Sequence, residues 1–300
     1  MKILVTGSSG FVGSHLVKNL RPHHQVETLD ARLVNDESTQ WHSQLEDCDV
    51  LVHLAGRAHV SSNKSDYEIY KKINCDLTET LARRVSKTKK HLIFVSTAVV
   101  YGHKSRHIQP FCVTDTLRPD SPYTASKVAA EKIIRELGQE SDLSYTIIRP
   151  PLVYGPEVKA NFLSMMRWVN SGLPLPLGCA KKPRSFVGIR NLTSLIEECS
   201  TNPMAKKQIF NASDDEDCST RDLLNSIAVE LNKSSRLVPI PLGILKLGSQ
   251  IIGKPRVFDS LCESFQLEMT HTKKTLNWTP PFSFKEEIRS TVSWFKSAQK

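Results

Sequence analysis

The sequence predicts an α/β protein built on a doubly wound parallel sheet, followed by a smaller C-terminal domain. In the first half of the 300 residues, short β-rich runs alternate with helical segments, an order typical of parallel sheets. The first apolar run leads directly into a glycine-rich turn, Gly7 to Gly13, and then into a helical stretch. After Arg149 the chain becomes dense in proline and glycine, which favours a change of domain.

The individual elements follow from local composition and spacing. The predicted strands are Lys2–Thr6, Gln25–Asp30, Val50–Ala55, His91–Thr97 and Tyr145–Arg149, and RSFVGI and QIFNAS are strand-like runs by which the chain returns to the sheet. Helices are predicted at 11–20, 66–87 and 122–137. The connection 31–49 is polar and too short for a full crossover helix with a strand, so no element is predicted there.

Composition argues against several classes of protein. No apolar run approaches bilayer length, and Lys2 precedes only a short apolar run, so we expect neither membrane insertion nor a signal peptide. Seven widely spaced cysteines without a C-x-x-C predict free thiols in a reducing cytoplasm, and no metal site. The net charge of +9 is spread along the chain with few aromatic residues, which favours a solvated basic surface or a small phosphate-bearing substrate over nucleic acid.

The glycine triad lies where a phosphate-binding turn would lie. Gly7 permits a tight turn, Gly10 lets a pyrophosphate approach the backbone, and Gly13 lets the helix pack closely on the strand. The second strand ends in Asp30, where a carboxylate binds both ribose hydroxyls of NAD and repels the 2′-phosphate of NADP. Arg32 suits that phosphate, so the sequence favours NAD and leaves NADP open. By itself the triad is also compatible with a plain flexible turn.

Two further stretches carry residues suited to acid–base chemistry. Tyr123 and Lys127 lie four apart in a predicted helix, which places both side chains on one face. An ammonium and a nicotinamide cation near a phenol both favour the phenolate, so we expect a lowered pKa for Tyr123 and a general acid or base near neutral pH. Thr97 ends a buried strand, where its hydroxyl can share a proton with Tyr123. The plain alternatives are a surface Tyr–Lys pair and an ordinary β-branched strand residue.

Five motifs follow one another along the chain. They are Thr6-Gly7-x-x-Gly10-x-x-Gly13, His53-Leu54-Ala55-Gly56, Ser96-Thr97 before Val100-Tyr101-Gly102, Tyr123-x-x-x-Lys127 and Arg149-Pro150-x-x-Val153-Tyr154-Gly155-Pro156. Together they resemble the extended short-chain dehydrogenase/reductases, the NAD-dependent nucleotide-sugar epimerases and dehydratases. The resemblance runs to the closing Leu276-Asn-Trp-Thr-Pro-Pro, and it is nearest to the branch that serves bacterial surface-polysaccharide (O-antigen) synthesis.

The resemblance implies a Rossmann-like NAD-binding domain of residues 1–155 and 184–214, and a nucleotide-sugar-binding lid domain of residues 156–183 and 215–300. It assigns catalysis to Thr97, Tyr123 and Lys127. The residues that it places on the cofactor are Gly7, Gly10, Phe11, Val12, Gly13, Asp30, Leu54, Ala55, Gly56, Tyr123, Lys127 and Pro150. The residues that it places on the substrate are Thr97, Asn161 and Arg184, the last two on the diphosphate, with Arg57, His59 and Arg256 as further candidates. A homodimer is an assembly that it allows.

Three reactions of the family share hydride transfer at C4 of the sugar. A 4,6-dehydratase needs an additional acid and base directly after the catalytic threonine, where this chain has Ala98 and Val99. The favoured function is 4-epimerisation of a UDP-hexose or UDP-N-acetylhexosamine, and the alternative is NAD(P)H-dependent 4-reduction of a UDP-4-keto-6-deoxy-hexosamine. Leu152 replaces an asparagine that contacts the substrate in many relatives, which leaves the pose of the sugar open.

Two non-enzymatic classes are alternatives to this function. A non-catalytic dinucleotide-binding regulator on the same fold usually lacks the Tyr–Lys pair, whereas this chain keeps both Tyr123 and Lys127. An RNA-binding role would require nucleic-acid affinity that falls steeply with salt.

Overall fold

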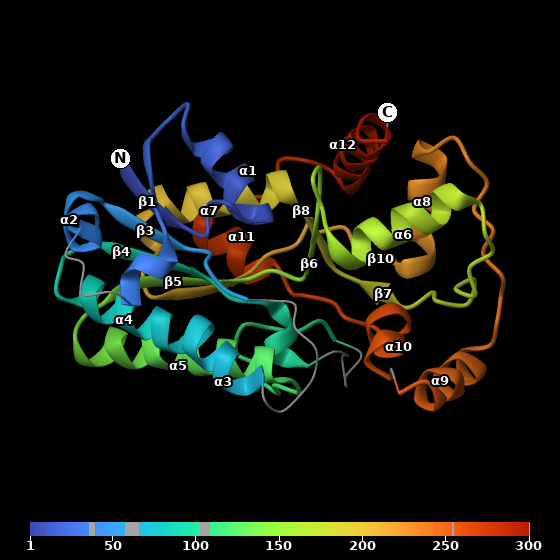
Figure 1. Ribbon diagram of the computed structural model, residues 1–300, viewed down its shortest axis with the longest axis horizontal. Coiled ribbons are helices and arrows are strands. Elements are labelled where there is room, and N and C mark those ends of the chain that lie inside the picture. The colour runs from blue at the N-terminus through green and yellow to red at the C-terminus, as the bar shows by residue number, and fades with distance from the viewer. Residues whose placement is uncertain (36–39, 58–65, 103–108, 254, 300) are drawn as a thin grey trace.

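The structure of the protein is a computed structural model that describes residues 1–35, 40–57, 66–102, 109–253 and 255–299 (Figure 1). One part of the molecule holds a parallel sheet with helices on both faces, and the other holds short strands and several of the later helices. Within the described ranges, no helix combines the length and the apolar character needed to cross a bilayer.

Six parallel strands form the central sheet in the order β2-β1-β3-β4-β5-β9. They are β1 (Lys2–Thr6), β2 (Gln25–Leu29), β3 (Val50–His53), β4 (His91–Val95), β5 (Ser144–Arg149) and β9 (Gln208–Asn211). At the carboxyl end of β1, Thr6 is in register with Leu29 on one side and His53 on the other. The chain therefore reverses its direction of progress between β1 and β3, and α/β sheets bind their ligands at such a point. The predicted doubly wound parallel sheet is confirmed.

Successive side chains of a strand point to opposite faces of the sheet, and each face has its own core. In β1, Ile3 and Val5 join one core with residues of α1 (Phe11–Leu20) and α7 (Ile189–Thr201). Leu4 points the other way and joins residues of α4 (Leu77–Ser86) and α5 (Pro122–Glu140). The predicted helix 66–87 consists of α3 (Asp66–Tyr70), a π-helical turn (Lys71–Asp76) and α4.

The sheet part contains a helix in the segment 31–49, for which no element is predicted. The polar connection after β2 contains α2 (Gln40–Asp47), whose Trp41 and Leu45 are buried in the same core as Leu4. Two apolar side chains four apart are enough to fix two helical turns against the sheet, although the segment is otherwise polar.

The later residues build a third core around Tyr154, Phe162 and Leu223. Their elements are β6 (Leu152–Tyr154), α6 (Ala160–Ser171), β7 (Pro183–Arg184), β8 (Phe186–Gly188), β10 (Cys218–Ser219), α8 (Thr220–Glu230), α9 (Leu242–Ile251), α10 (Pro255–Cys262), α11 (Thr270–Leu276) and α12 (Phe284–Ser297). Leu276 and Trp278 pack in the first core, with residues of α1 and α7. The proposed division of the chain into two domains stays a prediction.

The two strand-like runs predicted after Arg149 belong to different sheets. QIFNAS contains β9, which pairs with β5 and extends the central sheet as expected. RSFVGI contains β8, which pairs instead with β6, so that Leu152 is in register with Phe186 in a separate two-stranded sheet. The expectation that this run returns to the central sheet is wrong, because Phe186 is buried in the third core.

Candidate active site

The glycine turn closes against the end of β3. Gly7 has φ +70°, and a Cβ on it would lie 2.7 Å from the Ala55 nitrogen. A Cβ on Gly13 would lie 2.2 Å from the Gly7 oxygen, whereas one on Gly10 would meet that oxygen at 3.2 Å. The chain's own contacts thus require Gly7 and Gly13. Gly10 is the N-cap of α1 and has no side chain to bond its first N–H groups, which suits the turn to a pyrophosphate.

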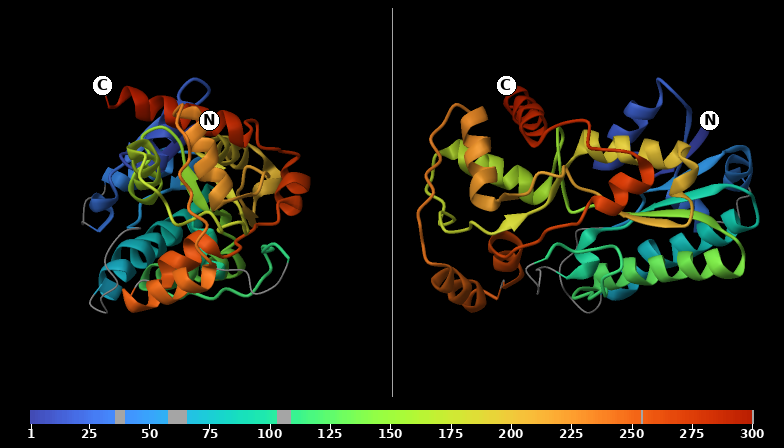
Figure 2. Two further views of the ribbon diagram at one scale, coloured as in Figure 1. Left: turned by 90° about the vertical axis from the view of Figure 1, so that its right-hand side faces the viewer. Right: turned by 180° about the vertical axis from the view of Figure 1, so that it is seen from behind.

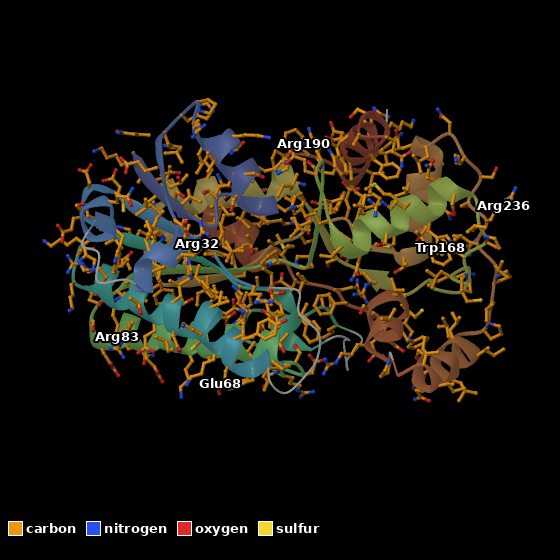
Figure 3. All side chains as sticks on the ribbon, viewed as in Figure 1. Arg32, Glu68, Arg83, Trp168, Arg190 and Arg236 are labelled. Atoms are coloured by element: carbon orange, nitrogen blue, oxygen red, sulfur yellow. The ribbon has the colours of Figure 1, made fainter. Side chains whose placement is uncertain are left out.

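Asp30 directly follows β2 and forms an ion pair with Arg32, which is labelled in Figure 3. The Arg32 Nη2 donates to Oδ2 at 2.5 Å, and Nε donates to Oδ1 at 3.0 Å. This hydrogen bonding lowers the pKa of Asp30 to about 2, so the carboxylate is ionised at physiological pH. A ribose bound here would share the carboxylate with Arg32.

The helix that carries Tyr123 begins with a full capping box. The Ser121 hydroxyl accepts from the Thr124 backbone N–H, and the Thr124 hydroxyl accepts from the Ser121 backbone N–H. Pro122 occupies the first turn, as predicted. This fixes Tyr123 in the first turn of α5, with its ring centroid 6.0 Å from that of Tyr70. The Thr97 hydroxyl interacts with the Tyr123 hydroxyl and favours its ionised form, and Thr97 Oγ1 also accepts from the Val99 N–H at 3.3 Å.

The protonation of Tyr123 differs from the expectation. Burial raises its pKa to about 12, the bond to Thr97 opposes that change, and Tyr70 adds to it. Lys127 is not among the groups of the chain that shift this pKa, and its Nζ donates to the Val95 carbonyl oxygen at 3.0 Å. The expected lowering of the pKa by Lys127 and a nicotinamide cation stays a prediction for the site with NAD bound. The residues of the chain alone therefore hold Tyr123 as a neutral phenol, a form suited to donating a proton.

Lys127 is buried where α5 meets the ends of β3 and β4. Its Nζ lies 4.5 Å from the centre of the Phe94 ring, and a Cβ on Gly56 would lie 3.4 Å from the same nitrogen. Burial lowers the pKa of Lys127 to about 8, while the charge of Glu131 opposes the shift. At neutral pH the ammonium is thus retained, next to Gly56.

Arg184 contacts the end of α10. Its Nη1 donates to the Asp259 carbonyl at 3.3 Å and to the Glu263 carbonyl, and its guanidinium carbon lies 5.6 Å from the centre of the Phe265 ring. Burial lowers its pKa to about 10, so it stays charged at neutral pH. The sequence did not predict this role in holding α10.

The other substrate candidates lie at helix ends or beyond β3. Asn161 is exposed in the first turn of α6. Arg256, near the start of α10, donates to the carbonyl of Asp120, just before α5. Arg57 is exposed after β3, and His59 lies outside the described residues.

Comparison with known proteins agrees with this geometry. Residues 3–212 match the family model described as the NAD dependent epimerase/dehydratase family. The chain belongs to this family. It is 37% identical to a UDP-glucose 4-epimerase of Vibrio cholerae, over 99% of this chain and 96% of the relative. It is 25% identical to an N-acetyl-alpha-D-glucosaminyl-diphospho-ditrans,octacis-undecaprenol 4-epimerase of Escherichia coli O157:H7, over 97% and 94%.

A solved structure has the same fold. The UDP-glucose 4-epimerase of Thermus thermophilus in complex with NAD aligns with a TM-score of 0.76 and 25% identity, over 99% of this chain and 100% of the other. The likeness in fold thus extends over nearly all of this chain.

This family member has a buried asparagine that sequence reasoning missed. Asn74 accepts from the Arg57 N–H at 2.8 Å and donates to the Arg57 carbonyl and to Ser126 Oγ. A Cβ on Gly56 would lie 3.1 Å from its Oδ1. Asn74 therefore ties the segment after β3 to the helix that carries Lys127. The available signal was a polar residue within the apolar stripe of the predicted helix 66–87.

The end of β4 offers a second signal of a ligand. Ala98 N–H donates to the Pro150 carbonyl at 2.7 Å, which holds Thr97 against the end of β5. Ser96 Oγ is buried and has no hydrogen-bond partner among the described residues. Because an unpaired buried hydroxyl is costly, its presence fits a site in which a ligand supplies the partner.

Proposed function

We propose that the protein is an NAD-dependent 4-epimerase of a UDP-hexose or UDP-N-acetylhexosamine. The observation that carries the proposal is that Tyr123, in the first turn of α5, interacts with buried Thr97, with buried Lys127 on the same helix. The glycine turn, Asp30, the 54–56 segment and Pro150 would hold NAD, which when bound accepts and returns a hydride. In this proposal residues 1–155 and 184–214 bind the cofactor, and residues 156–183 and 215–300 bind the nucleotide sugar.

The residues divide the acid–base work between them. The chain alone holds Tyr123 as a phenol, and a nicotinamide cation beside it would favour the phenolate. As the phenolate, Tyr123 would take the proton of the sugar C4 hydroxyl and return it after the sugar has turned over. Thr97 orients that oxygen and the phenol, while the Lys127 ammonium stabilises negative charge on the phenolic oxygen. Asn161 and Arg184 bind the diphosphate, for which a guanidinium is well shaped.

The positions after Thr97 argue against dehydration. Ala98 is fully buried and Val99 is partly buried, and neither side chain can transfer a proton. The alternative function, 4-reduction of a keto-sugar, would use the same three residues but consume NAD(P)H in each turnover. A cytoplasmic role in O-antigen synthesis and a homodimeric assembly stay predictions of the resemblance.

Product analysis tests the function directly. The purified protein is incubated with UDP-glucose or UDP-N-acetylglucosamine in the absence of added reductant, and the sugars are followed by proton NMR. A 4-epimerase forms the C4 epimer and reaches the same mixture from either side. A reductase leaves both sugars unchanged and turns over only a 4-keto-sugar with NAD(P)H, which would contradict the proposal.

Replacing Arg184 with alanine is expected to raise the KM for the UDP-sugar about tenfold or more, because a charge-assisted bond to phosphate contributes about 1.5–3 kcal/mol. The affinity for NAD, measured by calorimetry, is expected to stay unchanged.

The matched control for this variant is Lys182→Ala. Lys182 belongs to the same basic run and forms an ion pair with Glu263 at 2.5 Å, yet it is not assigned to the substrate. A thermal melt of both variants separates loss of the α10 contacts from loss of substrate binding. Weaker NAD binding with unchanged KM in Arg184→Ala would contradict the assignment.

Turnover is expected to fall as pH rises through about 8, the pKa of Lys127. Below that pH the ammonium is present, and above it the site loses a positive charge. The free energy of unfolding should instead rise with pH over this range. Between about pH 8 and the unfolded pKa of 10.5, the unfolded chain binds more protons at Lys127 than the folded chain does. A pH profile of kcat beside thermal melts checks this, and a kcat that stays level to pH 10 would contradict it.

A further inference from the structure

One segment of the chain contains basic residues and no acidic ones. Residues 231–258 contain no Asp or Glu, and their basic residues are Lys233, Arg236, Lys246, Lys254 and Arg256. The whole chain has 40 Lys and Arg against 31 Asp and Glu, an excess of 9. Five of those nine excess charges therefore lie in this one stretch, which contains α9.

The same segment exposes large apolar side chains. The α9 surface consists of Ile244, Leu247, Ile251, Ile252 and Val257, each between 51% and 77% exposed. The first three lie at helical spacing on one face of α9. The opposite face of α9 is covered, because Leu242 and Leu245 pack on the third core.

The surroundings of α9 leave the outer face open. A Cβ built on Gly243, Gly248 or Gly253 would have no atom within 4 Å. Figures 1 and 2 show α9 beside α10, at the edge of the molecule and away from the central sheet. Exposed apolar side chains that gather in one place mark interaction sites, whereas scattered ones need no explanation.

We propose that the α9 surface docks on an anionic lipid membrane. An interfacial helix buries its apolar face at the headgroup boundary while nearby Lys and Arg side chains attract anionic lipids. Lys246 on α9 and Arg236 before it are both exposed, and Arg236 projects from the edge of the molecule in Figure 3. A second copy of the chain is a poorer occupant, because pairing like surfaces would bring two unbalanced positive segments together.

Docking there would act close to the candidate site. Arg256 of α10 donates to the Asp120 carbonyl, directly before the cap of the helix that carries Tyr123. A membrane contact at α9 would thus restrict the movement of α9 and α10, and α10 contacts the segment just before α5. The proposal differs from the expectation of no membrane insertion, which rested on the lack of a spanning run, and it does not depend on the proposed enzymatic function.

Vesicle co-sedimentation tests the proposal with the full chain. Wild-type protein is expected to pellet about tenfold more with phosphatidylcholine–phosphatidylglycerol vesicles than with phosphatidylcholine alone. Binding should fall when the salt concentration is raised from about 0.05 M to about 0.5 M. The triple variant Ile244→Gln, Leu247→Gln, Ile251→Gln should lose about tenfold of the binding, and Lys246→Glu should weaken it.

The control is the double variant Val229→Gln, Met204→Gln, which removes equally exposed apolar side chains elsewhere and should bind as the wild type does. Circular dichroism and melting temperature confirm that each variant folds. Absence of binding to anionic vesicles, or equal binding of the triple variant, would overturn the proposal. So would a dimer in sedimentation velocity that the triple variant abolishes while vesicles bind neither protein.

Discussion

Replacing Tyr123 with phenylalanine is expected to lower turnover by roughly 10²–10⁴-fold, because the group that transfers the proton is removed. The phenyl ring keeps the contact with the Tyr70 ring, whose centroid lies 6.0 Å away, so the fold should be retained. Only the hydroxyl that interacts with Thr97 is lost. NAD binding, measured by calorimetry, should change little, and kcat for the UDP-sugar is the quantity to compare.

Tyr145→Phe is the matched control for this variant. Tyr145 is also buried and faces α5, where a Cβ on Gly138 would touch its ring, but it is far from the proposed chemistry. Its turnover should stay within about twofold of the wild type. The Thr97→Val protein should also have a lower turnover, because the substitution removes the hydroxyl that interacts with Tyr123. A Tyr123→Phe protein with near-normal turnover would show that another group transfers the proton.

The parts of the fold that follow from local signals could be predicted. β1 and α1 have the predicted bounds, and the cap and Pro122 locate the start of α5. The glycine triad could be interpreted because the positive φ of Gly7 and the close contact at Gly13 are demands of the backbone itself. Each of these features depends on residues close together in the sequence.

The remaining features depend on residues far apart in the chain. Whether RSFVGI joins the central sheet is decided by the fit of Phe186 into the third core. The pKa of Tyr123 depends on burial, on Thr97 and on Tyr70, and the Lys127 Nζ donates to the Val95 carbonyl, none of which spacing reveals. Arg184 could be identified as a phosphate-binding candidate, but its contact with the end of α10 arises only when α10 folds against it.

Replacing Glu131 with glutamine is expected to lower the free energy of unfolding by about 3–5 kcal/mol, because it leaves a buried guanidinium without its counter-charge. Glu131 and Arg149 are both almost fully buried, and Arg149 Nη2 donates to Oε2 at 2.6 Å. Arg149 Nη1 also donates to the Tyr101 hydroxyl at 2.8 Å, and that hydroxyl donates to Asn211 at 2.9 Å. The pair thus links α5 to β5 and β9.

Replacing Glu131 should also change the pKa of Lys127 in the candidate site. Glu131 lies one helical turn after Lys127, and its charge raises the pKa of Lys127 against the effect of burial. In Glu131→Gln the descending limb of the pH profile should therefore move below pH 8, a change that loss of stability alone would not produce.

The exposed pair Arg83–Glu79 is the matched control, since it joins two residues on one helix at 2.8 Å with both side chains in contact with water. Glu79→Gln should change the free energy of unfolding by about 0.5 kcal/mol or less. Urea unfolding of the three proteins, followed by circular dichroism, gives the comparison. If Glu131→Gln is no less stable than Glu79→Gln, the buried pair does not hold α5 on the sheet, and the position of Tyr123 and Lys127 depends on the capping box and on Asn74 instead.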